Sequence, residues 1–306
     1  MWHTLAPQWL SGDVEIQLRN RIRRDVADFA DLIDTWDAIN EVVIMPVSTA
    51  EVNAITELAK VKGRVPMIQL AFDEARAANP SATLLLNDFD LSERFERLIE
   101  ETLEAAVQID ALGLQTHMHQ GYWGEEKMLT MVDRFARFGL PLHLTESTLV
   151  SGHLMPPEIV DLNDYVVDSW PSTDEGEARQ ADKLVRHYRS LVSHPVVEAI
   201  TYWGITDTGA WLGAPVGLVR ADGTPKPSYD ALHSLINGEW WLPPTTMRTD
   251  ADGRLKVAGL YGNYRATAHG LRNQFTIPEG AARASQSTGQ RLSLNSSDDP
   301  RGSLSA

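Results

Sequence analysis

Two glutamates stand at the ends of apolar runs that need no charged residue for their own folding. Glu41 closes the run TWDAINE at 35–41, and Glu146 closes LPLHLTE at 140–146. Two carboxyl groups can cleave a glycosidic bond when one is protonated and donates to the leaving oxygen while the other is ionised and attacks or stabilises the anomeric carbon. Taken alone, a glutamate at a strand end is more often a capping or ion-pairing residue. The pair therefore suggests glycoside hydrolysis only together with its surroundings.

The segment from about Ile16 to Ile236 alternates short apolar runs with longer stretches of helical period, which is the pattern of βα units around a parallel sheet. Buried strands are predicted at 35–41, 83–87, 111–117, 140–146 and 197–204, and helices at about 16–32, 52–61, 92–108, 125–138 and 176–192. In a parallel barrel the loops after the strand ends form the active-site face. We therefore expect the side chains at the strand ends to meet there: Glu41, Asn87, Asp88, Gln115, His117, Glu146, Trp203 and Asp207.

The composition of the chain changes near its C-terminal quarter. Residues 239–278 hold short alternating stretches and an Asp252-Gly253 turn, which predict a small antiparallel β appendage. Residues 279–306 are rich in Ser, Ala, Gly and Asn with little to bury, which predicts a disordered tail. We therefore divide the chain into a barrel region at 1–238, the appendage and the tail.

The charge balance and the residue types exclude several partners. With 42 acidic and 27 basic residues the net charge is −15, which offers no electrostatic surface to a nucleic acid backbone or an anionic membrane. No cysteine is present, so thiolate nucleophiles, disulfides and Cys-ligated metals are excluded. His117 and His119 could form a metal pair, but no third ligand follows at a suitable spacing, and we expect no metal and no cofactor. No apolar run reaches the roughly 18 residues of a membrane span, and the first residues do not resemble a signal peptide.

Several motifs occur together in one order. WDAINE at 36–41 resembles the acid/base motif WD-x-x-NE, and HLTE at 143–146 resembles the nucleophile strand, of glycoside hydrolase family 10, the β-1,4-xylanases. The separation of 105 residues between Glu41 and Glu146 is similar to the spacing in that family. Five further segments resemble motifs of the same family in the same order: WHTLAPQW at 2–9, LLLNDFD at 84–90, GLQTH at 113–117, TYWGITDTGAWL at 201–212 and PKPSYDAL at 225–232. The chain therefore resembles a family 10 catalytic domain over residues 2–236.

The resemblance implies a (β/α)8 TIM barrel and a retaining enzyme that cleaves internal β-1,4-xylosidic bonds of xylan by double displacement. It also implies that Glu41 is the general acid/base, that Glu146 is the nucleophile and that the full-length protein is secreted. Substrate contacts are implied for Trp2, His3, Asn40, Phe89, Gln115, His117, Trp203 and Trp211. Aromatic faces pack on the apolar faces of pyranose rings, which agrees with the tryptophans in this set.

The resemblance fails in three places. The family barrel has two βα units and the start of a third before the segment that WHTLAPQW resembles, so we expect an N-terminally incomplete barrel whose open edges cause aggregation or oligomer formation. Leu5 stands where the family has Gln, and Thr148 stands where it has the Asp that holds the histidine matching His117. An alternative function is therefore that of a non-catalytic or weakly active polysaccharide-binding barrel fragment. The choice between xylan and mixed-linkage glucan stays open, as does the role of the appendage.

Overall fold

The computed structural model of the chain describes residues 11–48, 53–260, 262–268, 271–277 and 303–305. The predictions for Trp2, His3 and Leu5, and for most of the tail, lie outside these residues. The chain divides into two compact units, Met1–Ser228 and Tyr229–Ala306, and the change of composition near residue 238 comes shortly after this boundary.

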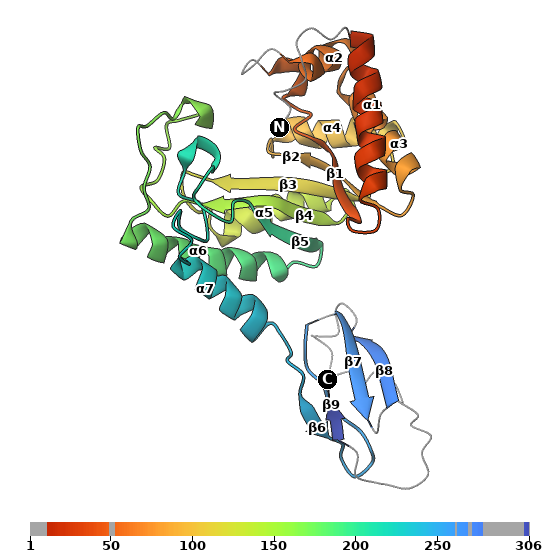
Figure 1. Cartoon of the computed structure of the whole chain (residues 1–306), viewed down its shortest axis with the longest axis vertical. Coiled ribbons are helices and arrows are strands. Elements are labelled where there is room, and N and C mark those ends of the chain that lie inside the picture. Colours follow the sequence, from red (N-terminus) through yellow and green to blue (C-terminus); the bar gives the residue numbers. More distant parts are fainter. Residues whose placement is uncertain (1–10, 49–52, 261, 269–270, 278–302, 306) are drawn as a thin grey trace. The chain divides into compact units, whose positions relative to one another are not determined.

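The first unit is built on a five-stranded sheet in which every neighbouring pair of strands is parallel. The strands lie side by side in chain order (Figure 1): β1 (Thr35–Asn40), β2 (Thr83–Asp88), β3 (Ala111–Met118), β4 (Leu142–Leu149) and β5 (Val197–Tyr202). Each of them confirms a strand predicted from an apolar run. A parallel sheet with a helix after each strand is the architecture of a (β/α)8 barrel, and the described residues form part of one.

Helices precede β1, connect the successive strands and continue beyond β5. They are α1 (Ser11–Asp28), α2 (Ala54–Lys62), α3 (Arg64–Ala78), α4 (Glu93–Glu104), α5 (Glu125–Ala136), α6 (Asp174–Val192) and α7 (Pro227–Ser234), with 3-10 turns η2 (Met45–Val47), η3 (Leu162–Asp164) and η4 (Trp211–Gly213) and a π-helical turn η5 (Leu235–Glu239). Asn53, Ser92 and Thr173 cap α2, α4 and α6, because their side chains accept from backbone N–H groups of the first turn.

Helix α3 is the one helix of the first sheet's connections that the sequence pattern does not predict. It packs against α1 on one side and against β1 and β2 on the other. Its buried face includes the acidic Glu74, and its exposed face includes Pro66 and Ala77. A charged residue on the buried face and apolar residues on the exposed face weaken the contrast between an apolar stripe and a polar face, and this contrast is the signal by which the other helices are predicted.

The centre of the sheet is more deeply buried than its edges. Nearly every residue of β2 and β3 is buried, whereas β1 and β5 carry exposed residues between partly buried ones. Among the described residues β1 and β5 are the edge strands of this sheet. Glu41 follows directly after one of these edge strands, and Glu146 belongs to the interior strand β4.

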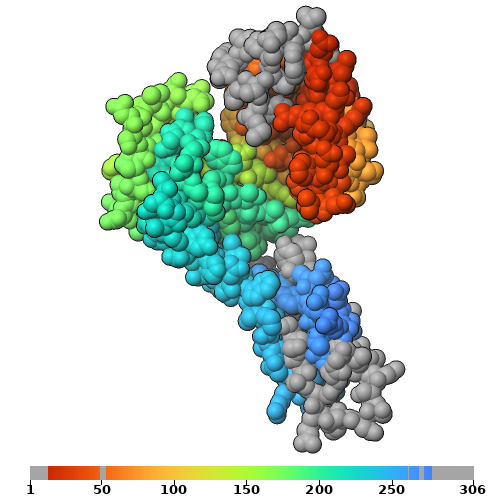
Figure 2. Space-filling model, in the orientation of Figure 1, coloured from red at the N-terminus to blue at the C-terminus, as the bar shows by residue number. Residues whose placement is uncertain are grey.

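Two loops rise at the carboxyl ends of the strands. The loop after β4 and the loop after β5 share a small apolar cluster formed by Val150, Met155, Trp170, Ala214 and Val216. In Figure 1 these loops, coloured green and teal, lie toward the arrowhead of β3. In Figure 2 the same loops form the green and teal block of this unit. The edge of the sheet that carries the candidate residues is therefore walled on one side by these loops.

The second unit contains an antiparallel sheet, as the alternating pattern of the appendage predicts. Its strands are β6 (Thr246–Arg248), β7 (Gly262–Ala268), β8 (Leu271–Ile277) and β9 (Ser303–Ser305), in the order β6-β9-β7-β8. Asp252-Gly253 forms a turn, in which Gly253 N donates to Asp250 O at 3.0 Å. The predicted tail contributes Ser303–Ser305 as β9, and residues 279–302 lie outside the described part of the chain.

Candidate active site

The two strands that lead to the glutamates both contain an extra residue. In the pairing of β1 with β2 the register shifts across Ala38, and in the pairing of β3 with β4 it shifts across Thr145. A bulge breaks the alternation of side chains along a strand and re-aims the next residue. Because of the second bulge, Thr145 and Glu146 both reach the same neighbour, Asn87. Bulges of this kind are frequent beside active sites.

Asn87 is the centre of the polar cluster, and it is fully buried. Its Nδ2 donates to Asn40 Oδ1 at 2.9 Å, with longer contacts to Glu146 Oε1 at 3.5 Å and Asp37 Oδ2 at 3.4 Å. Its Oδ1 accepts from Thr145 Oγ1 at 2.7 Å. Asn87, which belongs to β2, therefore connects the end of β1 with the bulged part of β4 through its side chain.

A glycine makes room for this asparagine. Gly113 lies opposite Asn87 in the pairing of β2 with β3, and a Cβ atom at Gly113 would stand 2.5 Å from Asn87 Oδ1. Such a distance is far inside van der Waals contact, so a larger residue at this position would have to displace the asparagine. Gly113 thus belongs to the site through the space that it leaves.

Gln115 and His117 complete a chain of contacts from one glutamate to the other. Gln115 Nε2 donates to Asn40 Oδ1 at 3.0 Å and to Glu41 Oε1 at 3.3 Å. Its Oε1 lies 3.2 Å from His117 Nε2, and the same nitrogen lies 3.2 Å from Glu146 Oε2. The structure therefore brings together five residues that the sequence singles out, Asn40, Glu41, Gln115, His117 and Glu146, at the carboxyl edge of the sheet.

The two glutamates differ in how their oxygens are held. Glu146 has one contact on each oxygen, from Asn87 on Oε1 and from His117 on Oε2. Glu41 has both of its contacts on Oε1, from Asn40 Nδ2 at 3.3 Å and from Gln115 Nε2. Within the described residues, Oε2 of Glu41 has no hydrogen-bond partner. One carboxylate is thus fixed at both ends, and the other keeps an oxygen available.

The backbone at Glu41 is also unusual. Its φ angle is 59°, in the left-handed region that residues with a Cβ rarely adopt. The conformation is maintained by two backbone hydrogen bonds, from Glu41 N to Asn87 O at 2.9 Å and from Met45 N to Glu41 O at 3.1 Å. Strain of this kind persists where the surroundings over-determine it and is found often at functional sites.

Two aspartates beside the glutamates have raised pKa values. Asp88 is fully buried, and burial, helped by the charge of Glu41, raises its pKa to about 7 although two backbone N–H groups donate to it. Asp37 is one of the exposed residues of β1, and desolvation of its carboxyl group by the surrounding protein, with the charge of Glu146, raises its pKa to about 6. Both aspartates therefore bind a proton more readily than a solvated aspartate does.

Two tryptophans stand against the same histidine. The rings of Trp203 and Trp211 lie 5.2 Å and 5.9 Å from the ring of His117, centroid to centroid. Trp203 N donates to Ser147 O at 3.0 Å, which ties it to the strand of Glu146. These aromatic residues and the glutamate cluster therefore share one wall of the site.

A buried ion pair holds the loop that carries these tryptophans. Lys226 is fully buried, and its Nζ donates to Asp207 Oδ1 at 2.7 Å and to Ser151 Oγ at 2.9 Å. Burial lowers the pKa of Lys226, and the contact with Asp207 opposes this effect. The lysine thereby joins the loop after β4 to the loop after β5.

The remaining predicted contacts are placed differently. Phe89 follows β2 at the same edge of the sheet and is 43% exposed. Trp2 and His3 lie outside the described residues. The residues for which the resemblance implies a role do not include Asp37, Thr145, Gly113 or Asn87, although Asn87 is among the strand-end residues expected at this edge. Asn87 had one visible signal, since an amide at the end of the apolar run TLLL has no local reason to be there.

The two histidines His117 and His119 do not assemble a metal site in the part of the chain that the structure describes. Their ring centroids lie 5.9 Å apart, and no group of three or more His, Cys, Asp or Glu side chains suited to a metal occurs among those residues. His119 is buried against Trp211 and Trp170, and burial lowers its pKa to about 4. It is therefore a neutral, aromatic-packed residue.

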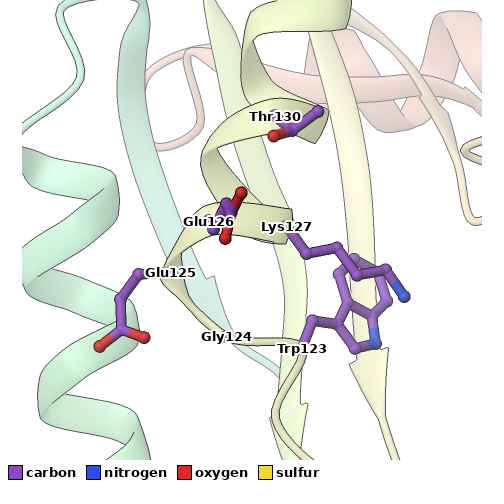
Figure 3. Close-up of a pocket in the computed structure, with 6 residues that line it drawn as sticks. All are labelled: Trp123, Gly124, Glu125, Glu126, Lys127 and Thr130. Carbon is purple, nitrogen blue, oxygen red and sulfur yellow. The ribbon is translucent and has the colours of Figure 1, made fainter.

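A further hollow of about 500 Å³ lies where the chain enters α5. Its lining residues are Trp123, Gly124, Glu125, Glu126, Lys127 and Thr130 (Figure 3). Lys127 Nζ stands 5.0 Å from the centre of the Trp123 ring, so an ammonium already occupies one face of this indole. Glu125 forms an ion pair with Arg186 of α6. Glu125 and Lys127 are therefore each engaged by a neighbouring side chain.

The family model described as glycosyl hydrolase family 10 matches residues 1–235. The chain belongs to glycosyl hydrolase family 10. Among family relatives, the endo-1,4-beta-xylanase B of Thermotoga neapolitana is 25% identical over 255 residues, which are 77% of this chain and 67% of that protein. An endo-1,4-beta-xylanase/feruloyl esterase of Xylanibacter ruminicola is 24% identical over 241 residues, 69% of this chain and 32% of that one.

Solved structures of family 10 xylanases share the fold. Xylanase 10B of Thermotoga petrophila, solved in complex with xylobiose, superposes with a TM-score of 0.58 at 23% identity and covers 78% of this chain and 72% of its own. The chain spans about a third of the length of the Xylanibacter ruminicola relative and about two thirds of the Thermotoga neapolitana one. The match agrees with the parallel sheet and with the barrel that the motifs imply. Within the described residues no helix is long and apolar enough to cross a bilayer.

Proposed function

We propose that this family 10 chain hydrolyses internal β-1,4-xylosidic bonds of xylan with retention of configuration, by double displacement. Glu41 is the general acid/base and Glu146 the nucleophile. The family match and the printed names of the relatives support the reaction and the substrate. The observation that carries the assignment of roles is the different holding of the two carboxylates, because a free oxygen suits proton transfer and a carboxylate held at both ends suits attack from a fixed position.

In the first step Glu41 donates its proton to the glycosidic oxygen while Glu146 attacks the anomeric carbon and forms a glycosyl–enzyme ester. In the second step Glu41 takes a proton from water, and the water attacks the same carbon and releases Glu146. Asn40 has both acceptor positions of its Oδ1 occupied by Asn87 and Gln115, so its Nδ2 is the group that donates to a sugar hydroxyl. Trp203 and Trp211 provide aromatic surface for the sugar rings.

The stereochemistry of the first product tests this mechanism. Proton NMR of the anomeric region during early hydrolysis of xylohexaose should show the β-anomer before mutarotation. An α-anomer appearing first would indicate inversion and a water between the carboxylates, which requires a carboxyl separation of roughly 6.5–9.5 Å instead of the 5–5.5 Å typical of retention.

A second candidate is polysaccharide binding with little or no hydrolysis. It is favoured by one observation: the strand before Glu41 is an edge strand of the described sheet, with exposed residues along its length. Affinity electrophoresis in gels that contain xylan separates the two candidates. Retarded migration without release of reducing sugar, in both the unmodified chain and Glu146→Gln, would favour binding alone.

A further inference from the structure

The hairpin of β7 and β8 in the second unit has two chemically different faces. Tyr264 and Phe275 are cross-strand partners with stacked rings, 5.5 Å apart, and they belong to the apolar face. On the other face Arg265 pairs with Gln274. Thr267 pairs with Arg272 on that same face, because alternate residues of a strand share a side. The result is a polar surface that contains two arginines and an amide.

The two arginines lie at diagonal positions of the ladder, where backbone neighbours are about 7–8 Å apart. Neither forms an ion pair with an acidic group of the described residues, whereas arginines of the first unit such as Arg19, Arg134 and Arg220 do. Without an acidic partner among the described residues, both guanidinium groups are available to an external anion.

The arginines stand over a hollow. An open hollow of about 520 Å³ is bordered by Arg265, Arg272, Asn273 and Gln274, all of which are exposed. Gln274 lies on the same face as the two arginines, whereas Asn273 pairs with Ala266 on the opposite face. The hollow thus offers guanidinium groups for a carboxylate and the side-chain amide of Gln274 for a hydroxyl, which are the two kinds of group on an acidic sugar.

The charge of the chain is distributed unevenly between its units. Residues 229–306 hold 8 basic and 7 acidic residues, which leaves 27 − 8 = 19 basic and 42 − 7 = 35 acidic residues in 1–228. The first unit therefore carries 19 − 35 = −16 and the second +1. A densely charged polyanion such as a nucleic acid is repelled by a unit of this charge. A polysaccharide with occasional carboxylates is repelled far less.

We propose that the polar face of the β7–β8 hairpin binds a polysaccharide that carries uronic acid residues, with Arg265 and Arg272 on the carboxylate and the amide of Gln274 on a ring hydroxyl. The planar guanidinium fork matches a carboxylate in bidentate geometry. The choice of a polysaccharide over other carboxylated polymers rests on the proposed function of the first unit. The site itself does not depend on hydrolysis and can be tested without it.

Affinity electrophoresis of the full chain in glucuronoxylan gels tests the proposal, with Glu146→Gln as the background so that the polymer stays intact. The same polymer with its carboxyl groups reduced to alcohols is the paired ligand. We expect tighter binding to the carboxylated form, and we expect Arg265→Gln/Arg272→Gln to weaken that binding by about tenfold or more. Arg248→Gln/Arg254→Gln removes the same charge from exposed positions of the same unit and should keep the affinity.

Several results would overturn the proposal. Equal binding of the carboxylated and the reduced polymer would show that no carboxylate is recognised. An equal loss in both arginine pairs would indicate general charge attraction, and oligo-dT binding that depends on Arg265 and Arg272 at the same salt would indicate a nucleic acid site. Arg265→Lys/Arg272→Lys keeps the charge but not the fork, and an intermediate loss with an unchanged thermal transition would support bidentate binding.

Discussion

The strand that carries Glu146 lies between two neighbouring strands, whereas the strand that leads to Glu41 has a neighbour on only one side within the described residues. Most of β4 is buried or partly buried, while β1 alternates with exposed positions. The side chains follow the same division. Donors from β2 and β3 fix both oxygens of Glu146, and donors reach a single oxygen of Glu41.

This difference corresponds to the two tasks that retention requires. A nucleophile must stand in line with one carbon atom, and fixed donors reduce the entropy lost in reaching that position. An acid/base must give a proton to an oxygen and take one from water in each cycle, so it needs an oxygen that solvent and substrate can approach. The edge position of β1 and the strained backbone at Glu41 allow the acid/base task. The interior position of β4, with a neighbouring strand on each side, allows Glu146 to stay fixed as the nucleophile.

The largest effect is expected at the fixed carboxylate. Glu146→Gln keeps the size of the side chain but removes the nucleophile, and kcat on xylan should fall by about 10⁴-fold or more. Initial rates of reducing-sugar release measure it. A loss of less than about tenfold would mean that Glu146 is a structural residue and that the comparison between the two carboxylates has been wrongly drawn.

The open carboxylate should respond differently. Glu41→Ala should lower the rate on xylan by about 10²–10⁴-fold, the usual contribution of general acid–base catalysis. Aryl xylosides with good leaving groups should be spared in the first step, because they need no proton. Added azide should restore turnover with a β-xylosyl azide as product, since only the second step then lacks its base. Equal losses on both substrates without azide rescue would remove Glu41 from the acid/base role.

The side chain of Asn87 contacts Glu146 directly and reaches Glu41 through Asn40, so displacing it should affect both carboxylates. Gly113→Ala places a methyl group 2.5 Å from the present position of Asn87 Oδ1, so the side chain of Asn87 must move. We expect this displacement to lower kcat by about 10²-fold. Gly238→Ala is the matched control, because nothing lies within 4 Å of its Cβ position. Wild-type kinetics for Gly113→Ala would show that Asn87 moves without consequence.

The strands of this site could be predicted, but the way they meet could not. Apolar runs ended by Glu41, Gln115 and Glu146 are visible in a single sequence, and so are the motifs around them. The bulges at Ala38 and Thr145 are not, because a register shift depends on the partner strand. Helix α3 is also not visible in the sequence, because its buried face contains Glu74 and its exposed face contains Pro66 and Ala77, which blurs the helical pattern.

The pairing of Gly113 with Asn87 is a further feature that the sequence does not show. Taken alone, each residue fits several interpretations, and Asn87 beside Asp88 also fits a purely structural role. Their close approach exists only once β2 and β3 are aligned in register. Local patterns therefore predict which residues stand at the edge of the sheet, and the register decides which of them touch.

The raised pKa of the buried Asp88 also predicts how the stability of the fold depends on pH. The pKa of Asp88 is about 7 in the folded chain, above its ordinary value, so the folded state holds this proton more tightly than the unfolded state does. Its contribution to stability is complete below about pH 4 and is lost as the pH rises through about 7.

Asp88→Asn should therefore flatten the decline in stability between pH 5 and pH 8, a difference of a few kcal/mol at most. Urea unfolding at both pH values measures this slope for each variant, whatever the absolute cost of the substitution. Glu104→Gln removes one exposed carboxylate from the end of α4 and should keep the slope of the unmodified chain. An identical slope in Asp88→Asn would place the pH dependence elsewhere.

The smallest effect is expected at Thr148, which contacts Glu146 only through His117. Thr148 is fully buried, and its Oγ1 lies 3.2 Å from His117 Nδ1. When His117 Nε2 donates to Glu146, Nδ1 of the neutral ring is an acceptor, and the hydroxyl of Thr148 donates to it. Thr148→Val removes this donor without changing the volume much, so the ring loses the contact that selects its tautomer. We expect kcat to fall by about two- to tenfold with little change in KM.

Thr148→Ser retains the hydroxyl and should behave as the unmodified chain, which separates the hydrogen bond from the packing of the methyl group. If Thr148→Ser loses activity while Thr148→Val keeps it, the methyl group is what matters. If neither loses any, the orientation of His117 is set by Gln115 and Glu146 alone. The small size expected here follows from the geometry of the nucleophile, because Asn87 still holds the other oxygen of Glu146 when the histidine is less well ordered.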